Sequence, residues 1–176
     1  MAAPTSNTKV TSIDQFISGF NGGTRLNRFE VTSSCLDYNR PYHIRAAQIP
    51  GAYISAIGLN YFGRTIELPG ERVYQPWQVT ILDDTGSQKV YDNFKKWQHN
   101  IGNRDLKTYV NIDEAFTCNF TVKQYKTDSD TVEKSFTLFN VWPIQVGPIE
   151  LDMSKDNQLC QFTVTFAYSH FDYNPV

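Results

Sequence analysis

From residue 161 to residue 168, hydrophobic and polar side chains alternate without a break. A period of two residues places one set on each face of a β-strand, whereas a helix needs a period near 3.6. One face therefore belongs to a hydrophobic core, and the other face is polar but nearly uncharged. The hydrophobic set is Phe162, Val164, Phe166 and Tyr168, and the other set is Gln161, Thr163, Thr165 and Ala167.

Shorter runs of the same kind predict further strands, so the chain is expected to be mostly β. Two of these runs form a predicted hairpin around Pro69-Gly70, and Pro76 marks an edge or a bulge in its second strand. A second hairpin is predicted around the turn Asp128-Ser129-Asp130. The expected strands begin near Phe29 and cover residues 42–49, 52–61, 66–68, 73–82, 120–127 and 132–141.

Two segments change to a helical period. The first begins at a capping box formed by Ser12 and Gln15, and Gly22-Gly23 ends it. The second begins at another capping box, from Thr85 to Gln88, and Gly102 stands where a left-handed C-cap belongs. Residues 103–118 are expected to be a connecting segment. The predicted hydrophobic stripes are Ile13, Phe16, Ile17 and Phe20 in the first helix, and Val90, Tyr91, Phe94, Trp97 and Ile101 in the second.

Length and charge favour one domain that does not bind nucleic acid tightly. With 176 residues, the chain predicts a flexible arm over residues 1–11 and a single domain over 12–176. Its net charge is −2, and its 16 basic residues are scattered among 18 acidic ones, so no patch for neutralising phosphates stands out. No signal peptide is recognised, and no run approaches the ~20 apolar residues of a membrane span. We expect a soluble chain made in the cytoplasm.

The residues that usually carry catalysis do not fall into catalytic patterns. The cysteines have no CxxC spacing and the histidines no metal-ligand spacing, while nucleophile motifs and phosphate-binding loops are absent. We therefore predict no enzyme, no cofactor and no metal, and three unpaired cysteines that are buried or half-buried. These residues are Cys35, Cys118 and Cys160, and His43, His99 and His170.

In its order of motifs, the chain resembles the tail tube protein family of T4-type contractile phage tails. Each motif is weak alone, but their order and spacing together are specific, and they run from the opening helix to the last strand. They are Ser12 to Phe16, Arg25 to Phe29, Gly63 to Arg72, Trp77 to Thr80, Tyr91 with Phe94 and Trp97, Phe139 to Ile144, Gly147 to Ile149, and Phe162 to Tyr168.

The resemblance implies a fold, an assembly and a location. It implies an antiparallel β-sandwich or barrel with a flanking helix that assembles into hexameric rings, which stack into the inner tube of the tail. The partners it implies are other copies of the chain, the tail sheath, the tape-measure protein, the baseplate and the tail terminator. It implies a virion protein, assembled in the host cytoplasm, whose lumen conducts DNA without binding it specifically. A Thr- and Gln-rich strand face suits such a lining, although an ordinary half-solvated sheet has the same pattern.

Two groups of residues are candidates for contacts between subunits. The long hydrophobic stretch 46–61, with Ile49, Tyr53, Ile57 and Tyr61, is assigned to contacts between stacked rings, and residues 103–118 are a further candidate. Four charged residues beside the predicted turn form ion pairs either across subunits or within the hairpin. They are Arg64, Glu67, Glu71 and Arg72. Trp77 and Trp97 are expected in the core.

Other functions remain alternatives. Within the structural class, the chain could be a tube–baseplate adaptor, a terminator, or a ring protein like those of type VI secretion and phage-tail-like bacteriocins. From another class, its 3 Trp and 10 Tyr are compatible with a carbohydrate-binding β-sandwich, but most of the aromatic residues fall on hydrophobic stripes. A cupin-type enzyme is the weakest alternative, because the histidines do not cluster.

Overall fold

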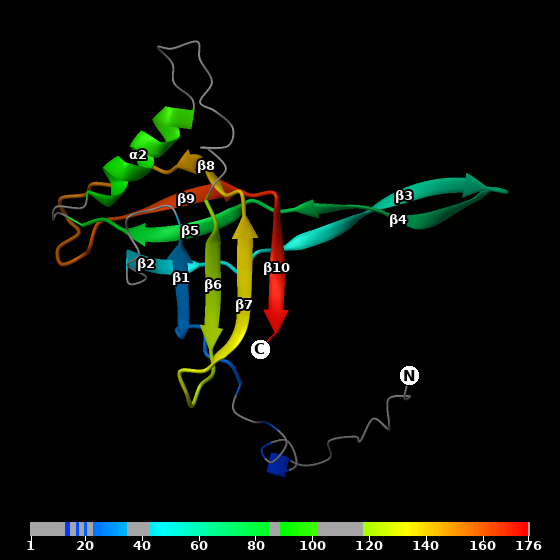
Figure 1. The fold of residues 1–176 in the computed structure, drawn as a ribbon, viewed down its shortest axis with the longest axis horizontal. Coiled ribbons are helices and arrows are strands. Elements are labelled where there is room, and N and C mark those ends of the chain that lie inside the picture. Colours follow the sequence, from blue (N-terminus) through cyan, green and yellow to red (C-terminus); the bar gives the residue numbers. More distant parts are fainter. Residues whose placement is uncertain are drawn as a thin grey trace.

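The computed structural model describes residues 13, 14, 17, 20, 23–34, 43–84, 89–101 and 118–175. These residues form two four-stranded antiparallel sheets, one long two-stranded hairpin and a helix that covers one end of the second sheet (Figure 1). The capping residues Ser12, Gln15 and Thr85 to Gln88 lie outside the described residues, as do Gly102, residues 103–117 and the arm 1–11.

The two sheets face one another, and their strands cross at a large angle (Figure 1). The first sheet has the order β1-β6-β7-β10, and the second has the order β2-β5-β9-β8. The strands of the first sheet are β1 (Phe29–Ser33), β6 (Phe120–Tyr125), β7 (Val132–Phe139) and β10 (His170–Pro175). The strands of the second sheet are β2 (Ile44–Ala47), β5 (Trp77–Leu82), β8 (Trp142–Val146) and β9 (Gln161–Ala167).

The alternating residues from 161 onward form β9, as predicted. Phe162, Val164 and Phe166 are each at most 2% exposed and point into the space between the sheets. Trp77 of β5 lies opposite Phe166 and is 1% exposed, so the prediction that it belongs to the core is confirmed. Its indole Nε1 donates a hydrogen bond to the carbonyl oxygen of Gln48 (2.6 Å), which satisfies the polar atom of a buried ring.

The helix α2 (Val90–Ile101) closes the core beside the second sheet, near β8. Its stripe is the predicted one: Val90 and Phe94 are buried, and Trp97 packs against the core. The Phe94 ring lies edge-on to Phe162 and Phe166, with 6.0 Å between ring centroids in each pair. At its start, the Asp83 carboxylate accepts a hydrogen bond from the backbone N–H of Tyr91 (3.2 Å).

The hairpin prediction around Pro69-Gly70 is wrong. β3 (Ala52–Tyr61) pairs instead with β4 (Arg64–Tyr74), the turn is Phe62-Gly63, and Pro69-Gly70 lies inside β4. The register shifts there by one residue, so Pro-Gly occupies a β-bulge, and proline is tolerated at a bulge of a ribbon that has only edge strands. A Cβ at position 70 would lie 2.7 Å from Ser55 Oγ, which explains the glycine.

Three further expectations are corrected. The predicted strand 73–82 is divided, because Gln75 and Pro76 separate β4 from β5. The expectation of three unpaired cysteines fails, since Cys118 is disulfide-bonded. Cys160 is free but exposed, not buried. The hairpin of β6 and β7 across residues 128–130 is confirmed, whereas β8 and β10 were not predicted.

Candidate assembly interface

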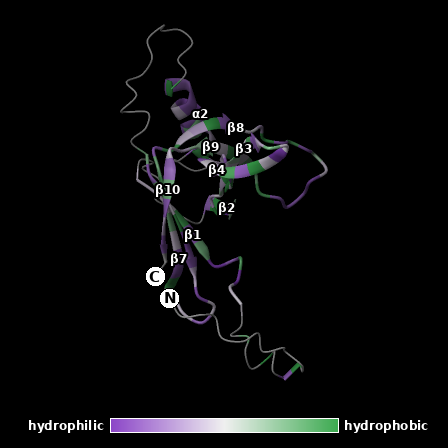
Figure 2. Ribbon diagram, turned by 90° about the vertical axis from the view of Figure 1, so that its right-hand side faces the viewer, coloured by the Kyte–Doolittle hydropathy of each residue, from purple (hydrophilic) through white to green (hydrophobic). Residues whose placement is uncertain are grey.

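The hairpin of β3 and β4 projects from the body as a long arm (Figure 1). Most of its residues are exposed, and hydrophobic and hydrophilic residues are mixed along it (Figure 2). A two-stranded hairpin is marginally stable by itself in water, because it has no layer against which to bury a face. An arm of this length therefore needs a partner surface.

The register sorts the side chains of the arm into two faces. In an antiparallel pair, residues opposite one another share a face, and every second residue along a strand joins them. One face, called here the hydrophobic hairpin face, carries seven large hydrophobic or aromatic side chains that are 38–60% exposed. Gly70 confirms this sorting, because a Cβ there would lie 3.0 Å from the Ile57 side chain. The seven residues are Tyr53, Ile57, Leu59, Tyr61, Ile66, Leu68 and Val73.

The opposite face of the arm is more polar. The Thr65 hydroxyl donates a hydrogen bond to Asn60 Oδ1 (2.9 Å), and Glu67 and Arg72 lie on the same face. Ile54 is the main hydrophobic residue of this face and is 56% exposed, as exposed as Ile57 on the other. The arm is thus amphipathic across its thickness, a pattern that suits burial of one face.

The structure brings some of the predicted contact residues together and separates others. Tyr53, Ile57 and Tyr61 share the hydrophobic hairpin face, and Arg64 stands beside Tyr61 at its outer end. Ile49 precedes β3 and is 50% exposed. The four predicted charges form no single cluster, because Glu67 and Arg72 lie on the polar face and Glu71 lies at the bulge.

The charged residues of the arm also lack partners within it. Among the described residues, ion pairs join Arg28 to Asp130, His43 to Asp84 and Lys155 to Glu150, and none involves the arm. Pairing within the hairpin, one of the two sequence-based interpretations, is therefore absent from the described part of the chain. Pairing across subunits stays a prediction.

The base of the arm is fixed to the body by aromatic contacts. The Tyr74 ring packs against Tyr168 and Phe171, with centroid separations of 5.8 and 5.6 Å. The Tyr168 hydroxyl donates a hydrogen bond to the Gly51 carbonyl oxygen (3.3 Å), and its burial raises the pKa of this phenol. The arm consequently leaves the body in a defined direction.

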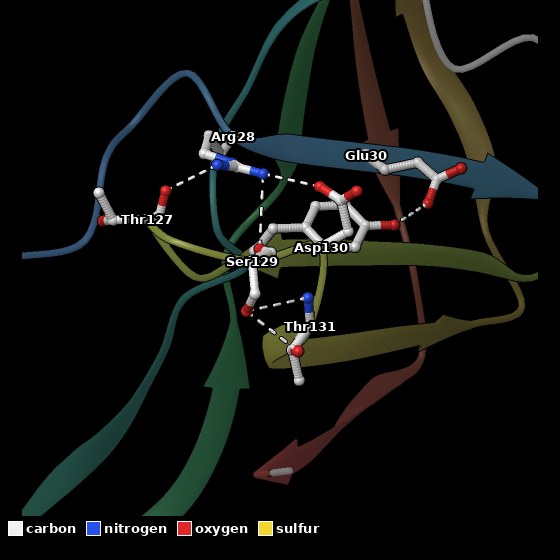
Figure 3. A network of polar contacts seen from close by, with 7 residues as sticks. Arg28, Glu30, Thr127, Ser129, Asp130 and Thr131 are labelled. Carbon is white, nitrogen blue, oxygen red and sulfur yellow. Dashed lines mark hydrogen bonds and ion pairs between the residues drawn. The ribbon is translucent and has the colours of Figure 1, made fainter.

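At the far end of the first sheet, Arg28 holds the turn between β6 and β7 (Figure 3). Its guanidinium donates to the carbonyl oxygen of Thr127 and to Asp130 Oδ1, both at 2.7 Å. Nearby, the Tyr125 hydroxyl donates to a Glu30 carboxylate oxygen (2.5 Å), and this hydrogen bond is the main reason that the pKa of Tyr125 is raised. The contacts fasten the chain before β1 to the body.

The outer face of the second sheet carries Thr and Gln side chains across β5 and β9. Because Val79 and Val164 point inward, their neighbours along each strand point outward. The pairs Gln78–Thr165 and Thr80–Thr163 lie on this face. The Thr and Gln side chains noted in the sequence thus form one continuous surface, and this surface lacks Lys, Arg, Asp and Glu along β5 and β9.

The loop at residues 147–160, between β8 and β9, was missed as a contact candidate. Leu151, Met153 and Leu159 are 89%, 103% and 74% exposed. Beneath the loop is a hollow of about 530 Å³, whose lining includes Thr80, Gln161 and Glu150. The loop has no hydrophobic period, so periodicity could not have identified it.

The described residues contain no group of His, Cys, Asp and Glu that could hold a metal ion. The described helices also include none long and hydrophobic enough to cross a membrane.

Solved structures of contractile injection assemblies contain chains with this fold. One chain of the anti-feeding prophage baseplate superposes with a TM-score of 0.66 at 13% identity, covering 89% of this chain and 98% of that one. One chain of the sheath–tube complex of an extracellular contractile injection system has a TM-score of 0.63 at 14% identity, covering 94% and 99%. Hcp1 from Flavobacterium johnsoniae has a TM-score of 0.51 at 13% identity, covering 85% and 96%. The chain therefore shares its fold with one chain of each of these structures.

The chain belongs to the phage tail tube protein family, whose sequence model matches residues 20–174. It is 26% identical to tail tube protein gp19 of Enterobacteria phage T4 over 162 residues, which cover 91% of this chain and 99% of gp19. It is 29% identical to the tail tube protein of Serratia phage KSP90, covering 84% and 86%. The resemblance to the T4 type is confirmed, and the chain is a structural protein of the virion and not an enzyme.

Proposed function

We propose that copies of this chain close into six-membered rings and that the rings stack into the inner tube of a contractile tail. The single observation that carries the proposal is the projecting arm, whose hydrophobic hairpin face has no covering layer in the isolated chain. A second copy supplies that layer. The contact is heterologous, because an arm meets a different surface, and heterologous contacts generate rings or open stacks.

Sheet edges supply the contacts around each ring. Among the residues that the structure describes, each four-stranded sheet ends in two strands with one unpaired side, β1 and β10 in the first and β2 and β8 in the second. Unpaired edges are an aggregation hazard in a monomer, and pairing or covering them between subunits removes the hazard. In the tail, we propose that the tube contacts the sheath, the tape-measure protein, the baseplate and the terminator. Chains with this fold occur in sheath–tube, baseplate and tube-cap assemblies.

We assign the part of this outer face around the Gln78–Thr165 pair to the lumen, through which DNA passes; Thr80 and Thr163 lie at the hollow beneath residues 147–160. Each Lys or Arg that neutralises a phosphate adds salt-dependent affinity, and affinity along a channel slows sliding. The Thr and Gln side chains of β5 and β9 offer hydrogen bonds that water can exchange and carry no charge; the positive charge beside them is Arg45 of the edge strand β2, which donates a hydrogen bond to Gln161. Thr165→Lys in assembled particles is expected to slow DNA release, with a larger effect at low salt. Equal release rates for Thr165→Lys and Thr165→Gln would reject this assignment of the lumen.

Electron microscopy of the purified protein over a range of concentrations, with sedimentation velocity in parallel, tests the assembly. Hollow tubes or six-membered rings are the expected result. Monomers at every concentration would contradict self-assembly. They would favour the alternative of an adaptor or terminator that needs a template, an alternative that the fold of a tube-terminating cap keeps open.

A further inference from the structure

The turn at the tip of the arm is built from an unfavourable residue. Phe62 and Gly63 both have positive φ angles, +48° and +73°, as in the two-residue type I′ turn of a hairpin. Such turns favour Asn-Gly, because Asn tolerates the left-handed region, whereas a bulky aromatic residue there is strained. Phe62 is also 88% exposed, so burial within the chain does not offset this strain.

Backbone strain of this kind is typical of residues at functional sites, including those that bind a ligand or a partner. The rings of Tyr61 and Phe62 meet edge to face, with centroids 4.5 Å apart, and both are exposed. Arg64 follows directly and has no ion pair among the described residues. Together Tyr61, Phe62 and Arg64 form what we call the hairpin tip, an aromatic pair beside a free positive charge.

The hollow beneath residues 147–160 has complementary properties. Its lining includes Leu151 and Leu159, which are among the most exposed hydrophobic residues of the described chain. It also includes Glu150, Asp152 and Lys155; Lys155 pairs with Glu150 (3.5 Å), whereas Asp152 has no ion pair among the described residues. Ser154 donates two hydrogen bonds to Asp152 Oδ1, from its backbone N–H (2.9 Å) and its hydroxyl (2.7 Å), and these orient the carboxylate. With about 530 Å³, the hollow has room for an aromatic side chain.

The tip and the hollow lie at opposite ends of the second sheet. The arm joins β5 at Trp77, whereas Leu82 at the other end of β5 pairs with Gln161, where the loop enters β9. Figure 1 shows the arm and the loop extending in opposite directions. A protrusion at one end and a matching hollow at the other cannot meet within one chain. They meet head to tail between copies, and such a contact repeats without closing.

We propose that the hairpin tip of one copy docks in the hollow beneath residues 147–160 of a copy in the next ring. Phe62 enters between Leu151 and Leu159, and Arg64 pairs with Asp152. The inference rests on the proposed tube and names the surface that receives the arm. It also accounts for the strained turn, since the strain is offset only when the ring is buried against a second copy.

A disulfide crosslink tests the docking directly, because the free thiol of Cys160 lines the hollow. Tubes assembled from Phe62→Cys and exposed to mild oxidant should give ladders of crosslinked subunits on non-reducing gels. Phe62→Cys combined with Cys160→Ser should give no ladder. Leu26→Cys, at a position before β1 that is equally exposed at 88%, should also give none. Tubes of Phe62→Cys without ladders would overturn the proposed docking site while leaving the tube intact.

A charge exchange gives a second, independent readout, and it decides the question if Phe62→Cys alone prevents assembly. Arg64→Glu should raise the protein concentration needed for tubes at least tenfold. Adding Asp152→Arg to the same chain should bring the required protein concentration most of the way back to the wild-type value, and this recovery should weaken at high salt. Failure of the double variant to recover, in a chain that melts like the wild type, would overturn the inference. Failure of the wild type itself to form tubes would refute the proposed function instead.

Discussion

Replacing Ile57 by Ser on the hydrophobic hairpin face should weaken assembly while leaving the fold unchanged. Ile57 is 56% exposed in the single chain, so about half of its surface remains to be buried by a partner. Full burial of an isoleucine side chain stabilises by about 1.5–3 kcal/mol, so burying the exposed half stabilises by about 1 kcal/mol. Ile57→Ser removes this contribution from the free energy of association of each arm. If all six arms of a ring contact the next ring, the free energy of association between two stacked rings is weakened by about 6 kcal/mol.

Ile54→Ser is the matched control for this experiment. Ile54 is on the same strand, is also 56% exposed and loses the same atoms, but it lies on the polar face. Turbidity and electron microscopy across a concentration series give the threshold for tube formation, and circular dichroism gives the melting temperature. We expect a higher threshold for Ile57→Ser than for Ile54→Ser, with both melting within a few degrees of the wild type. Equal thresholds for the two variants would refute the assignment of a single binding face.

Three predictions concern the body of the chain. Trp77→Ala should lower the free energy of unfolding by about 3–5 kcal/mol in denaturant titration, since it empties a site that is 1% exposed; a loss below about 1 kcal/mol would contradict its place in the core. Arg28→Ala should cost only about 1 kcal/mol in the same assay, because its Asp130 partner is 97% exposed, and high salt should reduce the difference. Tyr125 should ionise above its ordinary pKa of 10.0 in an ultraviolet titration, and Glu30→Gln should lower that pKa. The stability that this raised pKa represents is present below pH ~10 and disappears as the pH rises through the folded value; an unchanged Tyr125 titration in Glu30→Gln would contradict the hydrogen-bond account.

Local pattern was sufficient to predict β9, α2 and the β6–β7 hairpin, but not β8 or β10. In β9 the alternation is uninterrupted, and one face of the strand is buried, so period and burial agree. The same holds for α2, where Val90 and Phe94 occupy the predicted stripe. The β6–β7 hairpin was predictable because Asp-Ser-Asp is a common turn sequence.

The arm was misassigned because its local signals oppose its structure. Pro69-Gly70 is a strong turn signal but forms a bulge, and the actual turn contains Phe62, which disfavours it. Both departures concern the segment that we propose to bind another copy, and sites of function are where sequence rules are expected to fail. The predicted hydrophobic contacts Tyr53, Ile57 and Tyr61 do share one face, but only the pairing of β3 with β4 could reveal it.

A cryo-electron microscopy reconstruction of tubes assembled from the purified chain tests the central claim most directly. The account predicts sixfold rings in which the hydrophobic hairpin face of every arm is covered by another copy and the Thr- and Gln-rich face lines the channel. Arms that extend uncovered into solvent from an otherwise complete tube would contradict it.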